Sequence, residues 1–451
     1  MSTVILSAAS PELPSLQALA AVLSTELALE GETEVRRFEL STMKLAYCQG
    51  EFDCWVKTPG ICRAADAEHD IVAAIHDADN LILLDAVTFG GHSFTLKRAQ
   101  DRLICLLTPF FETRSALTHH GHRYATPANL FALGWLAEPD AAQAQTWLAL
   151  ADANAINLVA PRVGAVVVDD ARREAWPGAI RAMLSSNRRP GRNIGARRVL
   201  RGALLEAARP DLGATPPARV RTAALLVGSA KPRGTSTSEN LARALAARLA
   251  RQGVATELHF ATEFVHDGGS ALIAARAIAD ADLVVLAAPL YVDSLPALAT
   301  HALELVAKLR PPGVVSGQFM AVMNCGFPEP EQNRTALRIA RHFCARAGYR
   351  WAGGLPLGGG GTVNPEIALD AQHGPVQHVK RALDAAAPPL ARGEGVPPAA
   401  LALMMKSAIP DAVYRVMGDL GWRYRAHRNG LRQRALRARP LDRAAARHAD
   451  R

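Results

Sequence analysis

Glycine and hydroxyl residues gather between Gly228 and Ser238, directly after an apolar run (224–227) and before a helical pattern over 240–252. A strand that ends in such a turn and continues as a helix directs hydroxyls and backbone N–H groups at the positive end of the helix dipole, which suits a phosphate. The glycine spacing fits neither the dinucleotide fingerprint nor the Walker motif, because no Gly-Lys-Ser/Thr closes the loop. The stretch favours a mononucleotide phosphate, and a well-capped turn without a ligand stays open as the alternative. The candidate phosphate-binding residues are Ser229, Thr235, Ser236, Thr237 and Ser238.

Cysteines and histidines cluster in the first part of the chain. Cys48, Cys54 and Cys62 supply three thiolates, one fewer than a usual structural zinc or iron–sulfur site needs, and the separation of His69 is not diagnostic of a fourth ligand. We therefore expect a loop with cysteines and no metal. The run His-His-Gly-His at 119–122 lies on a predicted long loop, where adjacent side chains of an extended chain point to opposite sides and do not easily share one ion.

The chain has 451 residues, which favours two or three domains with large cores, and its 49% apolar and 21% charged residues are typical of a soluble globular protein. No apolar run is long enough to span a bilayer, and no basic leader precedes an apolar segment. Six cysteines in this length do not form a disulfide scaffold, so we expect a cytoplasmic protein. Cys105 and Cys344 fit helix cores, whereas Cys325 lies in a candidate ligand loop and is a candidate for oxidation.

The net charge of +9 is concentrated in the C-terminal tail, because 406–451 holds twelve Lys or Arg and four Asp or Glu. Three interpretations of this tail stay open: a helix packed across the two domains, a membrane-surface anchor, or a nucleic-acid arm. Packing on the protein's own body, through Val413, Met417 and Leu420, is the simplest of the three. We do not expect nucleic-acid binding, because no recognised module accompanies the arginines.

Strand-like and helix-like stretches alternate twice along the chain, over 1–170 and over 221–363, which predicts parallel sheets built from βαβ units. One local match relates the two halves: Asp77-Ala78-Asp79, an apolar run and Phe89-Gly90-Gly91 parallel Asp280-Ala281-Asp282, an apolar run and Val292-Asp293-Ser294, with one constant offset. The pattern predicts a duplicated fold. We expect domains over 1–184 and 220–390, a linker over 185–219 with one helix (197–208), and a basic helical tail over 391–451.

The second half resembles the flavodoxin-like NAD(P)H-dependent FMN reductase family, and the first half resembles the same superfamily. The stretch 228–238 resembles the family's phosphate loop, 289–296 (Pro-Leu-Tyr-Val-Asp-Ser-Leu-Pro) its second flavin-contacting loop, and 324–329 a third loop beside the ring. The resemblance implies an α/β fold of two tandem flavodoxin-like doubly wound parallel-sheet domains, each with strand order 2-1-3-4-5. Its expected ring contacts are Pro289, Leu290, Tyr291, Val292, Asp293, Asn324, Cys325, Gly326 and Phe327.

The two halves match the family unequally. The counterpart of the phosphate loop in the first half, Ser7–Ser15, contains two prolines, which lack N–H groups, and the acid Glu12, which repels phosphate. We therefore place FMN in the second half only.

The resemblance implies an NAD(P)H-dependent flavin oxidoreductase that transfers hydride through FMN, with NAD(P)H as co-substrate, to a small quinone-like or flavin acceptor. No catalytic acid–base residues are assigned. The alternative is a non-catalytic scaffold or electron-transfer protein that has lost its cofactor in one or both halves. A homodimer and a weak membrane-surface contact of the tail stay open.

Overall fold

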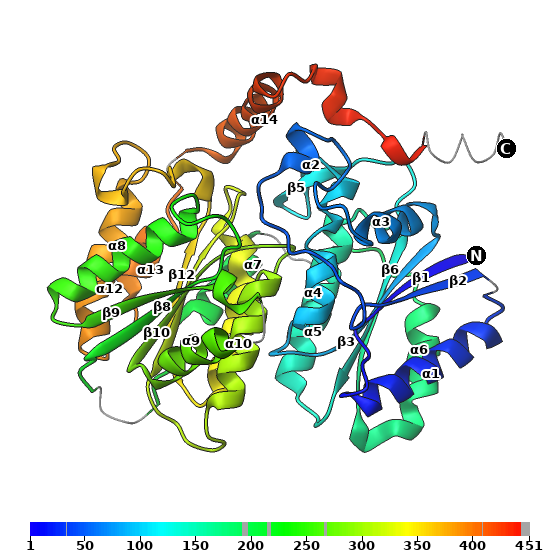
Figure 1. Cartoon of the computed structure of the whole chain (residues 1–451), viewed down its shortest axis with the longest axis horizontal. Helices are drawn as coiled ribbons and strands as arrows, with labels where there is room; N and C mark the ends of the chain where they lie inside the picture. Colours follow the sequence, from blue (N-terminus) through cyan, green and yellow to red (C-terminus); the bar gives the residue numbers. More distant parts are fainter. Residues whose placement is uncertain (33, 192–196, 214–217, 266–267, 408, 443–451) are drawn as a thin grey trace. The chain divides into compact units, whose positions relative to one another are not determined.

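The computed structural model describes residues 1–32, 34–191, 197–213, 218–265, 268–407 and 409–442 (Figure 1). Its residues fall into two compact units, which we treat separately. Unit 1 comprises residues 1–194 and 415–451, and unit 2 comprises residues 195–414. Parts of the predicted linker, 192–196 and 214–217, and the last nine residues of the tail lie outside the described residues. The four domain boundaries drawn from the sequence therefore stay a proposal.

Unit 1 is built on a five-stranded parallel sheet with strand order β2-β1-β3-β6-β7. The strands are β1 (Ser2–Ser7), β2 (Glu34–Glu39), β3 (Asn80–Ala86), β6 (Asn129–Leu136) and β7 (Val163–Asp169). The main helices are α1 (Pro14–Leu29), α2 (Asp53–Val56), α3 (Glu68–Asp77), α4 (Phe94–Gln100), α5 (Ala141–Asn157) and α6 (Trp176–Leu184). When the five strands of this sheet are numbered in chain order, their spatial order is 2-1-3-4-5, which confirms the predicted topology.

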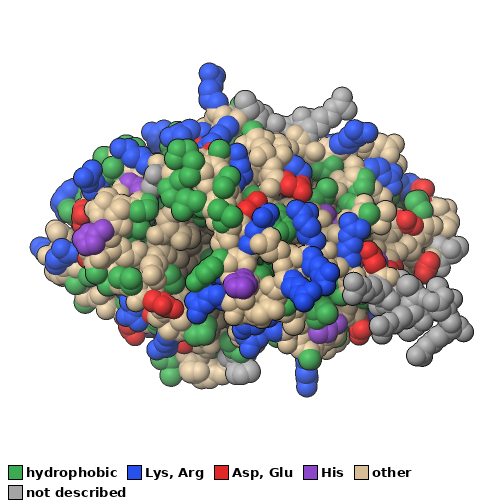
Figure 2. Space-filling model, turned by 90° about the horizontal axis from the view of Figure 1, so that it is seen from above, with side chains coloured by type: hydrophobic (Ala, Val, Ile, Leu, Met, Phe, Trp, Pro, Cys, Tyr) green, Lys and Arg blue, Asp and Glu red, His purple; other side chains and the backbone are tan. Residues whose placement is uncertain are grey.

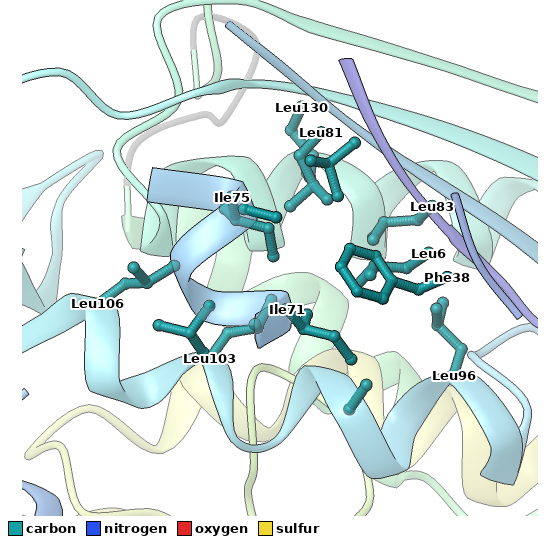
Figure 3. Close-up of a cluster of buried hydrophobic side chains, with 14 of the residues drawn as sticks. Leu6, Phe38, Ile71, Ile75, Leu81, Leu83, Leu96, Leu103, Leu106 and Leu130 are labelled. Carbon is teal, nitrogen blue, oxygen red and sulfur yellow. The ribbon is translucent and has the colours of Figure 1, made fainter. Parts of the chain in front are cut away.

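Two hydrophobic layers cover the sheet of unit 1, because its central strands are apolar on both faces. Helices α3, α4 and α5 bury their side chains on one face, and α1 and α6 on the other. Figure 3 shows the first layer, where Ile71 and Ile75 of α3 face Leu81 and Leu83 of β3. A parallel sheet protected on both faces leaves the loops at the carboxyl ends of its strands as the natural ligand edge.

The prediction of a long loop around the three histidines at 119–122 is wrong. Residues of this stretch form an antiparallel hairpin of β4 (Leu107–Arg114) and β5 (Leu117–His122). Ser115 and Ala116 at its tip both have positive φ, 49° and 65°, the backbone of a tight hairpin turn that these residue types seldom adopt. The turn lacks the glycine or asparagine that usually marks a hairpin in a sequence.

Unit 2 repeats the architecture with strand order β12-β11-β10-β8-β9, all parallel. The strands are β8 (Thr222–Val227), β9 (Ala255–Phe260), β10 (Leu283–Pro289), β11 (Gln318–Asn324) and β12 (Arg350–Leu357). The helices are α7 (Arg197–Ala208), α8 (Thr237–Arg251), α9 (Gly269–Asp280), α10 (Ala297–Leu309), α11 (Arg334–Arg346), α12 (Gln377–Ala391) and α13 (Pro398–Met404). The helix predicted inside the linker is α7. It docks on unit 2, where the Trp351 indole N–H donates to the Ala207 carbonyl at 3.1 Å.

The internal sequence match extends to the geometry of one turn. β3 and β10 begin 203 positions apart, at Asn80 and Leu283, and the turns that follow them carry positive φ at equivalent residues. These are Phe89 and Gly90 in unit 1, at 53° and 73°, and Val292 and Asp293 in unit 2, at 49° and 59°. In each unit the turn is closed by one antiparallel bridge, Thr88 with Gly91 and Tyr291 with Ser294. The two units therefore share a strand–turn–helix path, and not only a fold class.

The tail forms α13 and α14 (Asp411–Arg428), and the prediction of its packing face is wrong. Val413, Met417 and Leu420 are exposed. The opposite side of α14 packs instead: Gly418 lies against the Phe111 ring, and Ala426 is fully buried. A glycine and an alanine let the helix approach closely, whereas hydrophobic spacing alone pointed to the larger side chains. Among the described residues, no helix combines the length and apolar character needed to cross a bilayer.

Candidate functional site

Residues 228–236 form the loop between β8 and α8, at the carboxyl edge of the sheet of unit 2, and Thr237 and Ser238 begin α8. Ser236 is the N-cap of α8, and its hydroxyl accepts a hydrogen bond from the Glu239 N–H at 3.1 Å. Gly234, with φ of 80°, turns the loop so that its N–H donates to the Glu239 carboxylate at 2.6 Å. Arg243 pairs with the same carboxylate at 2.8 Å, which compensates the negative charge beside the loop.

Backbone donors remain at the tip of this loop. The first N–H groups of a helix have no acceptor inside the helix. In α8 the Glu239 and Asn240 N–H groups are satisfied by Ser236, through its hydroxyl and its carbonyl. For the N–H groups of Thr237 and Ser238, the first two residues of α8, the described residues provide no acceptor. The donor set thus fits a phosphate monoester, although Thr235 and Thr237 direct their hydroxyls to carbonyl oxygens of the chain.

Asn324, at the end of β11, connects the phosphate-loop candidate to the neighbouring strands. Its side-chain amide donates to the Ser238 hydroxyl at 2.8 Å and to the Ala288 carbonyl at 3.1 Å. The Leu290 N–H donates to the Asn324 carbonyl at 2.8 Å, which holds the loop after β10 beside the loop after β11. Residues predicted from three separate stretches of sequence are therefore brought to one edge.

The loops after β11 and β12 are closely joined. The Gly360 N–H donates to the Cys325 carbonyl at 2.8 Å, and the Gly359 N–H donates to the Phe327 carbonyl. A Cβ at Gly358 would lie 2.3 Å from the Pro328 carbonyl oxygen, so only glycine permits this approach. The predicted ring contacts 324–327 and the glycine run 358–361 thus form one wall of the site.

The turn over Tyr291–Ser294 forms another part of the edge. Asp293 and Ser294 are buried, whereas Pro289, Leu290, Tyr291 and Val292 are half-buried. A positive φ at Val292 is costly for a β-branched residue, because its Cβ crowds the backbone. Strain of this kind is retained where the surroundings over-determine the conformation, and it concentrates at ligand sites.

Cys325 does not have the exposure that its loop position suggested. Its side chain is buried, and the thiol lies within hydrogen-bonding distance of the Phe327 and Glu329 carbonyl oxygens at 3.3 and 3.5 Å. Burial raises the pKa of Cys325 to about 12. The thiol therefore stays protonated at neutral pH, and it serves packing and backbone contacts rather than redox chemistry.

Tyr414, in the first turn of α14, is a site residue that the sequence did not indicate. Its hydroxyl donates to the Gly326 carbonyl at 3.1 Å, and its ring lies over Gly359. Burial raises the pKa of this phenol well above its usual range. Tyr414 stands about 90 residues from the loop it covers, in a stretch whose composition suggests only a basic tail, so no local signal pointed to it.

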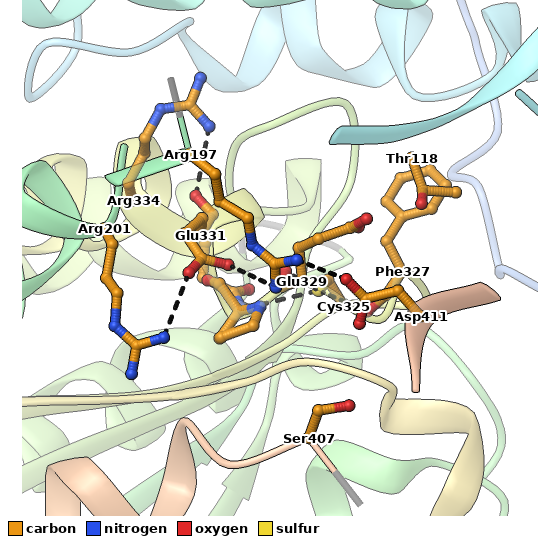
Figure 4. A network of polar contacts seen from close by, with 12 residues as sticks. Thr118, Arg197, Arg201, Cys325, Phe327, Glu329, Glu331, Arg334, Ser407 and Asp411 are labelled. Carbon is orange, nitrogen blue, oxygen red and sulfur yellow. Dashed lines mark hydrogen bonds and ion pairs between the residues drawn. The ribbon is translucent and has the colours of Figure 1, made fainter. Parts of the chain in front are cut away.

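An ion-pair cluster holds the start of α14 in place within unit 2 (Figure 4). Arg197 of α7 pairs with Asp411, which lies one helical turn before Tyr414, and with Glu331 at 3.4 Å. Arg201 approaches the same Glu331 carboxylate at 3.8 Å. Glu331 is completely buried, so the two arginines compensate a carboxylate that has lost its contact with water.

The corresponding loop of unit 1 lacks the donors of unit 2. The N-cap of α1 is Leu13, which offers no side-chain hydrogen bond, and Pro14 follows it. The Ser15 hydroxyl donates to the Asp170 carboxylate at 2.9 Å, so an acid already lies beside this helix end. Asp170 is itself paired with Arg173, which also contacts Ser15, so the missing donors decide the fit: Leu13 offers no capping hydroxyl and Pro14 has no N–H for a phosphate.

Beside the predicted cysteine loop of unit 1 lie two buried charged residues, Glu68 at the start of α3 and Arg102 after α4. Arg102 pairs with Asp66 at 2.6 Å and donates to the Cys62 sulfur at 3.3 Å. Burial raises the pKa of Glu68 well above its ordinary value. No group of three or more His, Cys, Asp or Glu side chains suited to a metal ion occurs in the part of the chain that the structure describes.

Residues 222–330 match the family model described as NADPH-dependent FMN reductase. This segment is thus similar to that family. The match spans less than half of the chain, and it contains β8, the phosphate-loop candidate, the Tyr291–Ser294 turn and the wall over 324–327. It identifies the segment as that of an NAD(P)H-dependent flavin oxidoreductase, with FMN as cofactor and NAD(P)H as co-substrate. A search of curated protein sequences gives no match.

Solved structures also resemble parts of the chain. An azoreductase from Bacillus anthracis is 13% identical, with 38% of this chain and 99% of that chain covered and a TM-score of 0.27. An NAD(P)H:quinone oxidoreductase from Methanothermobacter marburgensis is 15% identical, with 31% and 87% covered and a TM-score of 0.25. Identities and TM-scores this low support no conclusion about function.

Proposed function

We propose that unit 2 binds one FMN and that the protein passes hydride from NAD(P)H to a small quinone-like or flavin acceptor. The observation that carries the proposal is the convergence of Ser238, Asn324 and the glycine wall at the end of a sheet whose segment matches the FMN reductase family. FMN, when bound, supplies a ring that takes a hydride from a nicotinamide and releases it to an acceptor.

The chain's own residues would position the phosphate and the ring. The Thr237 and Ser238 N–H groups, with the Ser236 and Ser238 hydroxyls, would bind the phosphate at the α8 helix end. The backbone of 289–293 and 324–327 would contact the ring. Tyr414 and the glycine wall would limit access of water to it, which strengthens polar contacts inside the site.

One observation favours the alternative of a unit that has lost its cofactor. The Ser236 hydroxyl already accepts the Glu239 N–H, and the Glu239 carboxylate takes the Gly234 N–H that would otherwise be available to a phosphate. A loop satisfied by its own side chains is stable without a ligand.

We expect the purified protein, reconstituted with FMN and desalted, to hold one FMN per chain by its visible absorbance. Anaerobic addition of NADPH or NADH should bleach this absorbance. The nucleotide that bleaches it faster is the preferred hydride donor. Two FMN per chain would place a second site in unit 1. No FMN after reconstitution would instead support the alternative of a scaffold without cofactor.

Tyr414→Ala should weaken FMN binding about tenfold, because it removes both the ring over Gly359 and the hydrogen bond to Gly326. A loss of about 1.4 kcal/mol corresponds to this factor. Tyr414→Phe, which keeps the ring, should have a smaller effect, since one neutral hydrogen bond contributes about 0.5–1.5 kcal/mol. Fluorescence titration of the apoprotein with FMN measures both. Tighter binding by Tyr414→Ala would show that the tyrosine ring competes with the flavin.

A further inference from the structure

Large apolar side chains form an exposed stripe along α14. Val413, Val416, Met417, Leu420 and Tyr424 are between 48% and 62% exposed. At 100° per residue these five positions fall within an arc of about 100° on one side of the helix. The other side is covered, as Gly418 and Ala426 show. Because the buried face of the helix is already satisfied, the stripe is not a core face displaced from its partner.

Arginines border this stripe. On the helical wheel Arg423 lies on one side of it and Arg428 on the other, and both are exposed. From Arg415 to Asp442 the chain carries eight Arg and two Asp, a net charge of +6. On the face drawn in Figure 2, Lys and Arg side chains lie next to hydrophobic ones.

We propose that α14 is a surface anchor for an anionic lipid bilayer. A helix with an apolar stripe bordered by arginines lies in the plane of the bilayer surface, with its apolar side chains among the acyl chains and its arginines at the lipid phosphates. Anionic lipids attract each nearby basic residue, so the net charge of +6 complements such a surface. The contact is peripheral and reversible, and none of the stripe residues is among the proposed FMN contacts.

Other occupants fit the stripe less well. A second copy of the chain, docked through the same stripe, would bring two surfaces of net charge +6 together, which is repulsive. A nucleic acid would use the arginines, but it leaves Val416, Met417 and Leu420 in water without a role.

The test is co-sedimentation of the full chain with vesicles of phosphatidylcholine containing 30% phosphatidylglycerol, compared with phosphatidylcholine alone. We expect binding to the anionic vesicles that weakens as salt increases. Met417→Glu/Leu420→Glu should reduce the bound fraction at least tenfold, and Arg423→Glu/Arg428→Glu should do the same. All four positions are exposed, so thermal stability should fall little, with the contact of Arg423 over the Phe110 ring as the interaction removed.

A matched control lies on another helix. Leu272 and Ile273 of α9 are 52% and 73% exposed, and Leu272→Glu/Ile273→Glu should leave vesicle binding as in the wild type. Equal binding to neutral and anionic vesicles, or no binding of the wild type, would overturn the proposal. Two further results would overturn it: self-association measured by light scattering, or binding to RNA, that the Met417→Glu/Leu420→Glu variant abolishes. In either case vesicle binding of that variant would persist. FMN content serves as the separate readout of the site in unit 2 and should not change.

Discussion

Replacing Ser236 and Ser238 with alanine should weaken FMN binding at least a hundredfold. Each serine offers a hydrogen bond to a charged phosphate, worth about 1.5–3 kcal/mol, and each 1.4 kcal/mol corresponds to roughly a factor of ten. The structure makes Ser238 the more decisive of the two. Asn324 donates to its oxygen at 2.8 Å, which orients the hydroxyl and leaves its own proton for the ligand. The measurement is FMN retained per chain after desalting, together with Kd from fluorescence titration.

Two controls separate this effect from simple destabilisation. Ser236 caps α8, so its loss also costs about 0.5–2 kcal/mol of stability, whereas Ser236→Asn keeps a capping acceptor. Ser10→Ala/Ser15→Ala changes two hydroxyls of the equivalent loop in unit 1, where Asp170 already binds Ser15, and should leave the FMN content unchanged. If only this unit 1 variant loses its flavin, the FMN site lies in unit 1 and not in unit 2.

Gly358→Ala should disrupt the wall between the loops after β11 and β12. The new Cβ would lie 2.3 Å from the Pro328 carbonyl oxygen and 2.8 Å from the Pro330 nitrogen, and neither backbone atom can move aside cheaply. Overpacking of this kind costs about 1–3 kcal/mol, which lowers Tm by roughly 2–4 °C for each kcal/mol in a unit of this size. Because the displaced loop carries Cys325–Phe327, FMN affinity should fall with stability. Differential scanning calorimetry and FMN titration measure the two effects.

Gly326→Ala is the matched control for the stability effect. It lies in the same wall, its φ is not positive, and no heavy atom lies within 4 Å of the Cβ that alanine would add. Its Tm should therefore remain that of the wild type. If Gly358→Ala melts like Gly326→Ala, the close approach of the two loops is not a constraint on the fold.

The architecture could be predicted from the sequence because its strands are short apolar runs separated by helix-length segments. The helix expected inside the linker, over 197–208, is α7 with its predicted ends. The shared Asp-Ala-Asp segments before β3 and β10 identified the repeat. The hairpin of β4 and β5 escaped prediction because Ser115 and Ala116, at its turn, are not residues that favour positive φ.

The candidate site was predictable where it depends on local motifs and not where it depends on distant contacts. Ser238 and Asn324 were predicted from separate loops, and the structure places them within hydrogen-bonding distance. That Cys325 is buried depends on the Phe327 and Glu329 carbonyl oxygens folding back over its thiol, which no spacing reveals. The position of Tyr414 over the loops depends on the ion pair between Arg197 and Asp411. This pair joins segments more than 200 residues apart in the sequence.

The shared turn after β3 and β10 separates the path of the backbone from the chemistry it presents. In unit 1 the last residue but one of β3 is Asp85, whose carboxylate accepts from the Ser93 N–H and hydroxyl at 2.9 and 2.5 Å. In unit 2 the equivalent position is Ala288, and its carbonyl accepts from Asn324 instead. The same corner is thus stabilised by an internal carboxylate in one unit and by a neighbouring loop in the other. The backbone path of this turn therefore tolerates different side chains. They can diverge to bind a new ligand, or none, while the strand, turn and helix keep the same arrangement.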